Sequence, residues 1–275
     1  MNPMYSAFVA MFASQVALAA PAAPPASAAP PPRDDCCAVI ELRQYITYPG
    51  KRDDLFALFE REFIEPQEAV GIRVLGQFRD YNDPHRFTWL RGFPDMAARK
   101  KGLTDFYYGP LWKSFKSQAN ATLYDNDDVL LLRPASPGAG FMPATSARAP
   151  RDATLPQAGF VVATLYHFKQ EVSADFIAGF NAELAPLFER SGARILGRFV
   201  TDKSVNTFEQ LPVRENVNVF VWFAHYADRA AWERYNAALA SDVRWRDQLF
   251  SALHKGLARP PETLMLQPSA RSLLR

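Results

Sequence analysis

Hydrophobic and polar residues follow two periods along this chain, a period of two that is typical of strands and a period near 3.6 that is typical of helices. In the first half the segments come in the order strand, helix, strand, strand, helix, strand. Strands are expected at 39–47, 74–81, 87–93 and 129–132, and helices at 53–68 and 95–120. Asp95 stands where an N-cap belongs, and Gly109-Pro110 interrupts the second helix.

The second half repeats this order. Strands are expected near 160–168, 193–201, 219–226 and 263–266, and helices near 174–190 and 228–257. Residues 71–78 and 192–199 are identical at five of eight positions, at an offset of 121 residues. Farther along, the offset becomes 133, so the second copy holds about 12 additional residues between Thr201 and Asn218. The chain is therefore predicted to contain one unit twice.

A unit of this order forms a four-stranded antiparallel sheet with both helices on one face, as in a ferredoxin-like fold. The other face of each sheet would stay uncovered, and packing the two uncovered faces together buries them within one chain. The sequence therefore predicts an α+β fold. Two tandem β-α-β-β-α-β units would pack sheet to sheet as a pseudo-dimeric α/β barrel of eight strands.

The first residues have a different composition. Residues 5–20 form a mostly apolar run, and Ala17-Leu18-Ala19 carries the small residues that signal peptidase requires. We expect export to the periplasm or the exterior; because no Lys or Arg precedes the run, a leader kept in the cytoplasm is the alternative. The expected segments are a signal peptide at 1–20, a disordered Pro/Ala spacer at 21–36, a first unit at 37–134, a Pro-rich linker at 135–157, a second unit at 158–268 and a tail at 269–275.

Composition and motifs exclude several classes of protein. Lys and Arg number 31 against 29 Asp and Glu, which argues against a nucleic-acid binder that neutralises phosphates. No apolar run reaches the ~20 residues of a membrane span, so no integral membrane segment is expected. The adjacent Cys36 and Cys37 could oxidise with each other or with a second chain, but they cannot clamp two parts of a fold. The four histidines lack metal-ligand spacing and no dinucleotide motif occurs, so neither a metal nor a cofactor is expected.

Charged side chains stand on otherwise apolar strands. In the first strand, alternation places Glu41, Arg43 and Tyr45 on one face, and we expect Ile40 and Leu42 to face the helices instead. The polar face would then line the space between the two sheets. An ion pair of the glutamate with a neighbouring arginine, stabilising the interface of the sheets, is the alternative.

The third strand adds Trp89 and Arg91 to this expected cavity, and the second copy adds Trp222 and His225. Aromatic walls with a few aimed charges suit a small aromatic or anionic ligand. His225 and His254 are candidates for a general base, but a hydrogen-bonded or solvent-facing histidine is the simpler interpretation. No catalytic residue is assigned.

Several stretches of the chain resemble the NIPSNAP family. They are IELRQY at 40–45, HRFTWLRGFPD at 85–95 and NVFVWFAHYAD at 218–228. The second copy departs from the first, because Thr164, Ala224 and Trp232 stand where the first copy has arginines at 43, 91 and 99. The resemblance implies a dimeric α/β-barrel fold, and it implies no reaction, because the family has no agreed one. Relatives on this fold include cofactor-free monooxygenases and haem-handling proteins.

We therefore expect an exported NIPSNAP-like protein, a monomeric pseudo-dimer or a homodimer, that binds a small ligand between its two sheets. One alternative is a cofactor-independent oxygenase or isomerase, with an arginine that holds an enolate and a histidine or tyrosine as base. The other alternative is a protein-interaction module, in which the outer helices or the insertion at 201–218 dock a partner.

Overall fold

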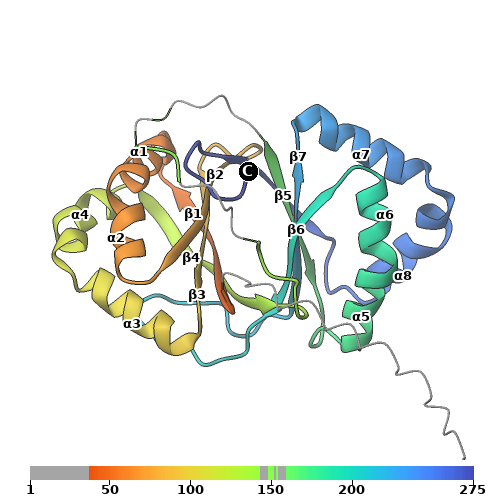
Figure 1. Ribbon diagram of the computed structural model, residues 1–275, viewed down its shortest axis with the longest axis horizontal. Helices are drawn as coiled ribbons and strands as arrows, with labels where there is room; N and C mark the ends of the chain where they lie inside the picture. The colour runs from red at the N-terminus through yellow and green to blue at the C-terminus, as the bar shows by residue number, and fades with distance from the viewer. Residues whose placement is uncertain (1–36, 143–147, 152, 154–158) are drawn as a thin grey trace, which may run out of the picture. The chain divides into compact units, whose positions relative to one another are not determined.

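The computed structural model describes residues 37–142, 148–151, 153 and 159–275, all within one compact unit (Figure 1). The predicted signal peptide at 1–20 and spacer at 21–36 lie outside these residues, as does Cys36, and export stays a prediction. Cys37 is buried and disulfide-bonded. In the described part of the chain, no helix combines the length and the apolar character needed to span a membrane.

The first half folds in the predicted order of elements. Its strands are β1 (Val39–Thr47), β2 (Arg73–Asp80), β3 (Arg86–Phe93) and β4 (Leu123–Pro134). Its helical segments are α1 (Arg52–Leu58), a π-helical turn (Phe59–Phe63), α2 (Ile64–Ala69), α3 (Met96–Tyr107) and α4 (Pro110–Asn120). The Asp95 carboxylate accepts a hydrogen bond of 2.7 Å from the Ala98 backbone N–H and so caps α3, as predicted.

The second half repeats these elements. Its strands are β5 (Phe160–His167), β6 (Arg194–Thr201), β7 (Val219–Tyr226) and β8 (Glu262–Pro268). Its helical segments are α5 (Ala174–Gly179), a π-helical turn (Phe180–Leu184), α6 (Ala185–Arg190), α7 (Arg229–Ser241), a second π-helical turn (Trp245–Leu249) and α8 (Phe250–Lys255). Gly71 and Gly192, which are related by the repeat, have φ of 84° and 115°. Glycine adopts this left-handed conformation without strain, and here it turns the chain from a helix into the next strand.

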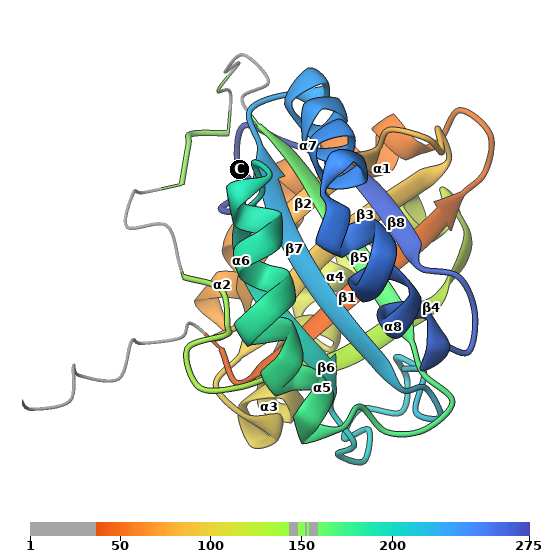
Figure 2. The ribbon, with the colours of Figure 1, turned by 90° about the vertical axis from the view of Figure 1, so that its right-hand side faces the viewer.

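All eight strands form one closed antiparallel barrel in the order β1-β3-β2-β8-β5-β7-β6-β4. Two pairings join the halves: β2 pairs with β8, and β4 pairs with β6. Helices α1–α4 cover the first half on its outer side, and α5–α8 cover the second half (Figures 1 and 2). The predicted pseudo-dimeric α/β barrel of two ferredoxin-like units is confirmed.

The interior of the barrel is filled by apolar side chains from all eight strands, and none of its described members comes from a helix. Ile40 and Leu42 belong to this cluster, so the prediction that they face the helices was wrong. Phe141, from the linker, adds to the filling and lies 4.5 Å from Phe199 between ring centroids. Apolar side chains from both halves fill most of this interior. Gln44 and Thr88, direct partners between β1 and β3, are buried polar residues on the same inward face.

Candidate functional site

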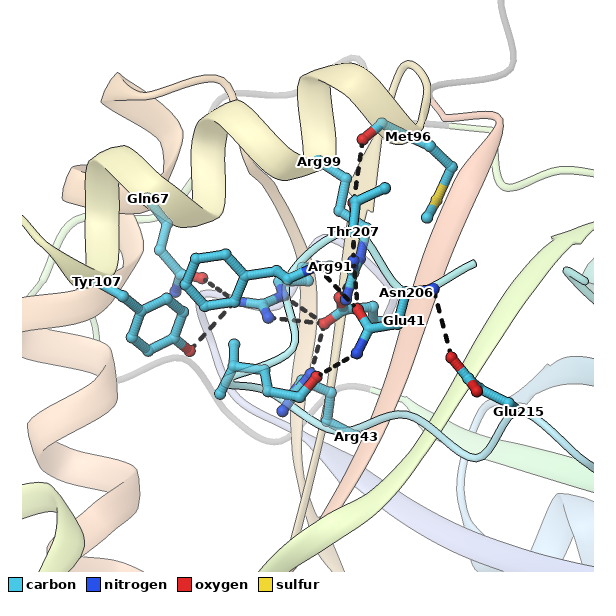
Figure 3. A network of polar contacts seen from close by, with 12 residues as sticks. Glu41, Arg43, Gln67, Arg91, Met96, Arg99, Tyr107, Asn206, Thr207 and Glu215 are labelled. Atoms are coloured by element: carbon cyan, nitrogen blue, oxygen red, sulfur yellow. Dashed lines mark hydrogen bonds and ion pairs between the residues drawn. The ribbon is translucent and has the colours of Figure 1, made fainter. Parts of the chain in front are cut away.

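Three arginines surround Glu41 on the outer side of the sheet, beneath α2 and α3 (Figure 3). Arg43 Nη1 donates to Glu41 Oε2 at 2.6 Å, and Arg91 Nε donates to the same oxygen at 2.7 Å. Arg99 Nε donates to Glu41 Oε1 at 2.6 Å. The four side chains are completely buried. Strand register produces this contact, because Glu41 and Arg91 are direct partners between β1 and β3.

This cluster leaves Glu41 no capacity to accept a proton. Burial by itself would raise the pKa of Glu41, but the charges of Arg91, Arg43 and Arg99 together hold that pKa far below its ordinary value. Both carboxylate oxygens are engaged in charge-assisted hydrogen bonds. With three cations and one anion, the cluster carries a positive charge beneath the helices.

Aromatic and amide groups continue the network around the arginines. Arg43 Nε donates to the Tyr45 hydroxyl at 2.7 Å. Arg91 Nη1 donates to Gln67 Oε1 at 3.3 Å and to the Tyr107 hydroxyl at 3.4 Å (Figure 3). The guanidinium carbons of Arg43 and Arg91 lie 5.7 and 5.0 Å from the centroid of the Trp89 ring. Trp89 therefore contacts both arginines through cation–π interactions.

A cavity lies beside the cluster, between the sheet of the first half and its helices. Its empty space is about 500 Å³, including open solvent at the mouth, which is more than one water molecule occupies. Its walls are Tyr45, Leu55, Phe59, Phe63, Gln67, Phe87, Trp89, Phe106, Tyr107, Trp112, Ala119, Asn120, Leu123, Asn126 and Leu211.

Trp89 brings an unsatisfied donor to this cavity. Its side chain is 2% exposed, and its Nε1 has no hydrogen-bond partner among the residues that the structure describes. A buried N–H without a partner costs roughly 1–3 kcal/mol. Trp222 Nε1 in the second half has no partner among the described residues either, so it is the cavity beside Trp89 that distinguishes the first half.

The additional residues of the second copy cover this site. They lie in the segment between β6 and β7, residues 202–218, here named the insertion loop, which reaches α3 of the first half (Figure 1). Arg99 Nη1 donates to Asn206 Oδ1 at 3.0 Å, and the Phe208 ring lies 5.8 Å from the Tyr107 ring. The change of repeat offset places this loop between Thr201 and Asn218, but only the structure shows which half it covers.

The second half lacks the charged cluster. Val162 pairs with Ala224 between β5 and β7, in the positions where Glu41 pairs with Arg91 in the first half. An acid and an arginine are thus replaced together by apolar side chains. Both replacements belong to the apolar cluster beneath the helices of the second half.

The second half has a hollow at related positions, where Phe176, Phe180 and Leu184 correspond to Leu55, Phe59 and Phe63, but Trp222 is not among its described lining residues. Phe188, which occupies in α6 the repeat position of Gln67 in α2, stacks on the Trp222 ring at 4.8 Å with an interplanar angle of 18°. Both side chains are buried in the apolar cluster of that half. An aromatic ring therefore fills the space that the glutamine leaves open in the first half.

The structure brings five of the seven predicted site residues together. These are Glu41, Arg43, Tyr45, Trp89 and Arg91, and they lie between the sheet and the helices, so the prediction that they line the space between the sheets was wrong. The physical reason is that α2 and α3 supply polar partners on the outer side, whereas the inward side is filled mainly by apolar side chains.

The other two predicted residues lie elsewhere. Trp222 lies beneath the helices of the second half, and His225 lies on the opposite face of β7, with the inward-facing Phe223. Burial lowers the pKa of His225, and Arg194 lowers it further. His225 therefore does not join the cluster around Glu41.

Gln67, Arg99 and Tyr107 belong to the site but were not predicted as members. One signal in the sequence could have found them. At the repeat offsets of 121 and 133, their counterparts in the second copy are Phe188, Trp232 and Ala240. The second copy therefore lacks these polar side chains together with the charged side chains of the strands. In the described part of the chain, no three His, Cys, Asp or Glu side chains are grouped as a metal site would require.

Comparisons with known proteins agree with this architecture. Residues 40–137 match the family model of NIPSNAP. Among curated proteins, none matches the chain significantly. A proposed monooxygenase of Fusobacterium nucleatum is similar at a TM-score of 0.51 and 13% identity, over 84% of this chain and 91% of that one. A proposed monooxygenase of Lactobacillus acidophilus reaches 0.51 and 10%, over 84% and 93%. At these identities the similarity shows the fold alone.

Proposed function

We propose that this protein, whose first repeat is a NIPSNAP domain, binds a small aromatic molecule with a hydrogen-bond acceptor oxygen. The ligand would lie in the cavity between the sheet and the helices of that repeat. The observation that carries the proposal is Trp89, a buried residue of the cavity wall whose Nε1 has no partner in the described structure.

The rest of the cavity wall supports this ligand class. Most of the wall is aromatic, and such surfaces accept a planar ring by stacked or edge-to-face contacts. The neighbouring cluster carries three arginines against one glutamate, and its positive charge favours an electron-rich oxygen near Trp89. A carbonyl or phenolate oxygen has this character.

The same geometry favours binding over proton abstraction. Among the described residues that line the cavity, none is a histidine or a carboxylate. Glu41 is held as an anion by its arginines, and burial raises the pKa of Tyr45, so neither is suited to act as a base. The cofactor-independent oxygenase stays a prediction, supported by the fold shared with the proposed monooxygenases; its substrate would have to ionise without a base from this cavity.

The experiment compares an aromatic ketone with its hydrocarbon analogue. We expect 2-acetylnaphthalene to bind the full chain about fivefold more tightly than 2-ethylnaphthalene, because one buried hydrogen bond is worth about 1 kcal/mol. Trp89→Phe should remove this preference while leaving the hydrocarbon affinity nearly unchanged. Equilibrium titration followed by ligand fluorescence measures both affinities.

Trp222→Phe is the matched control, because Trp222 occupies the same repeat position and is buried without an open cavity beside it. This variant should keep the preference for the ketone. Absence of binding by the unmodified chain, or equal affinities for the two compounds, would contradict the proposal.

A further inference from the structure

The insertion loop (residues 202–218) belongs to the second half of the chain, yet it packs on the site of the first half. In the first copy, the corresponding connection between β2 and β3 is a short turn at 81–85. This turn also contacts the second half, where the Tyr81 ring lies 5.9 Å from the Phe160 ring, but it is shorter than the insertion loop.

The loop is fixed near both of its ends. On one side, Arg99 Nη1 donates to Asn206 Oδ1 at 3.0 Å (Figure 3). The same oxygen accepts from the Phe208 backbone N–H at 3.1 Å. On the other side, Arg214 pairs with Asp128 at 2.8 Å, and its backbone N–H donates to the β4 backbone at 2.8 Å. Anchors on both sides hold the segment between them against the first half.

Aromatic packing and the cavity wall lie between these anchors. Phe208 is buried, and its ring lies 5.8 Å from Tyr107 and 6.2 Å from Tyr108. The Tyr108 hydroxyl accepts a hydrogen bond from Gln210. Leu211 follows and forms part of the wall of the cavity. The loop thus presents one aliphatic side chain to the space where the ligand would lie.

We propose that Leu211 is a specificity-determining residue, which sets the size of the aromatic ligand that the cavity admits. Among the described residues of the cavity wall, Leu211 is the one that the second half supplies. The other walls stand on the strands and helices of the first half or directly adjoin them. A change of this side chain can therefore alter the cavity while the sheet and its charged cluster stay in place. This inference rests on the proposed function.

The test measures the affinities of one-, two- and three-ring aromatic ketones for the full chain and its variants. The probes are acetophenone, 2-acetylnaphthalene and 2-acetylanthracene. We expect Leu211→Phe to weaken the two-ring ketone about tenfold and acetophenone less than about twofold, because small changes of volume in an apolar pocket discriminate by such factors. Leu211→Ala should improve the affinity for the three-ring ketone relative to the two-ring ketone about fivefold.

Val205→Ala is the control, since Val205 stands on the same loop with 80% of its surface exposed. It should leave the ratios of affinity unchanged. The inference would be overturned if, in both Leu211 variants, the ratios of affinity between the three ketones stayed within about twofold of those of the unmodified chain. The proposed function would then be left intact.

A second measurement tests whether Leu211 limits access to the cavity. It does not require a ketone to bind, so it stays informative if the proposed function is wrong. Trp112 lines the same cavity, so quenching of its fluorescence by acrylamide reports access through the mouth. The difference between each chain and the same chain with Trp112→Phe isolates this signal. Leu211→Ala should increase the quenching constant about twofold, and an unchanged constant would overturn the inference.

Discussion

Glu41 and Arg91 face each other across the β1–β3 ladder, and a hydrogen bond of 2.7 Å joins their side chains where neither has exposed surface. This pair is the centre of the cluster that distinguishes the first half of the barrel from the second. In the second half the same two positions hold Val162 and Ala224. One chain therefore carries a charged cluster under one set of helices and apolar packing under the other.

Loss of the Glu41 charge should destabilise the fold strongly. Glu41→Gln leaves three arginines buried without their anion, and breaking a buried ion pair in this way costs about 3–5 kcal/mol. Urea unfolding followed by circular dichroism measures the change in the free energy of unfolding.

Glu183→Gln is the matched control for this prediction. Glu183 pairs with Arg244 at 2.6 Å, but the two side chains are 46% and 51% exposed. Its loss should cost less than about 1 kcal/mol, since exposed pairs are screened by solvent. Equal effects of the two variants would show that burial of the cluster does not determine its energy.

The free energy of unfolding should fall as the pH is lowered below about 4.5. Burial alone would raise the pKa of Glu41, but the three arginines lower it far more, so the folded chain keeps this carboxylate ionised. The unfolded chain takes up a proton near the ordinary value of 4.5, so it binds more protons than the folded chain. This group contributes at most about 1.4 kcal/mol per pH unit below that value.

Urea unfolding at pH 7, 5, 4 and 3 measures this slope, and carbon-13 NMR of the side-chain carboxyl groups assigns it. Asp80 serves as the internal comparison, because burial raises its pKa. The Asp80 resonance should titrate at higher pH than that of Glu41, which should stay constant down to pH 3. Titration of the Glu41 resonance between pH 5 and 3 would disprove the assignment.

Phe188→Ala should open in the second half the space that exists in the first. Phe188 is 1% exposed and stacks on Trp222, so its truncation should cost about 3–5 kcal/mol and leave a cavity. The new cavity should bind benzene, which thermal denaturation with and without benzene detects as a rise in Tm.

Phe250→Ala is the comparison, since Phe250 is 46% exposed on α8. This variant should lose about 1 kcal/mol or less and gain no benzene-dependent rise in Tm. A small loss of stability in the Phe188 variant would mean that α6 collapses onto the sheet.

The sequence by itself determined the repeat, the order of the elements and the class of fold. Periodicity places each strand and helix, and two copies of a sheet with one uncovered face have few ways to bury it. It also determined that Glu41, Arg43 and Arg91 converge, because strand register follows from the alternation of side chains.

Only the tertiary structure decided which face of β1 and β3 points inward. Both faces of β3 are rich in apolar side chains, since Phe87 and Trp89 lie under the helices while Leu90 fills the barrel. The alternation of side chains along a strand defines its two faces, but it does not show which of two apolar faces points into the barrel. Which face points inward depends on the closure of all eight strands into one barrel. It depends also on Arg99 and the insertion loop, which come from distant parts of the chain and contact each other. Contacts between residues that are distant in the sequence form only in the complete fold, so the local periodicity of the sequence does not reveal them.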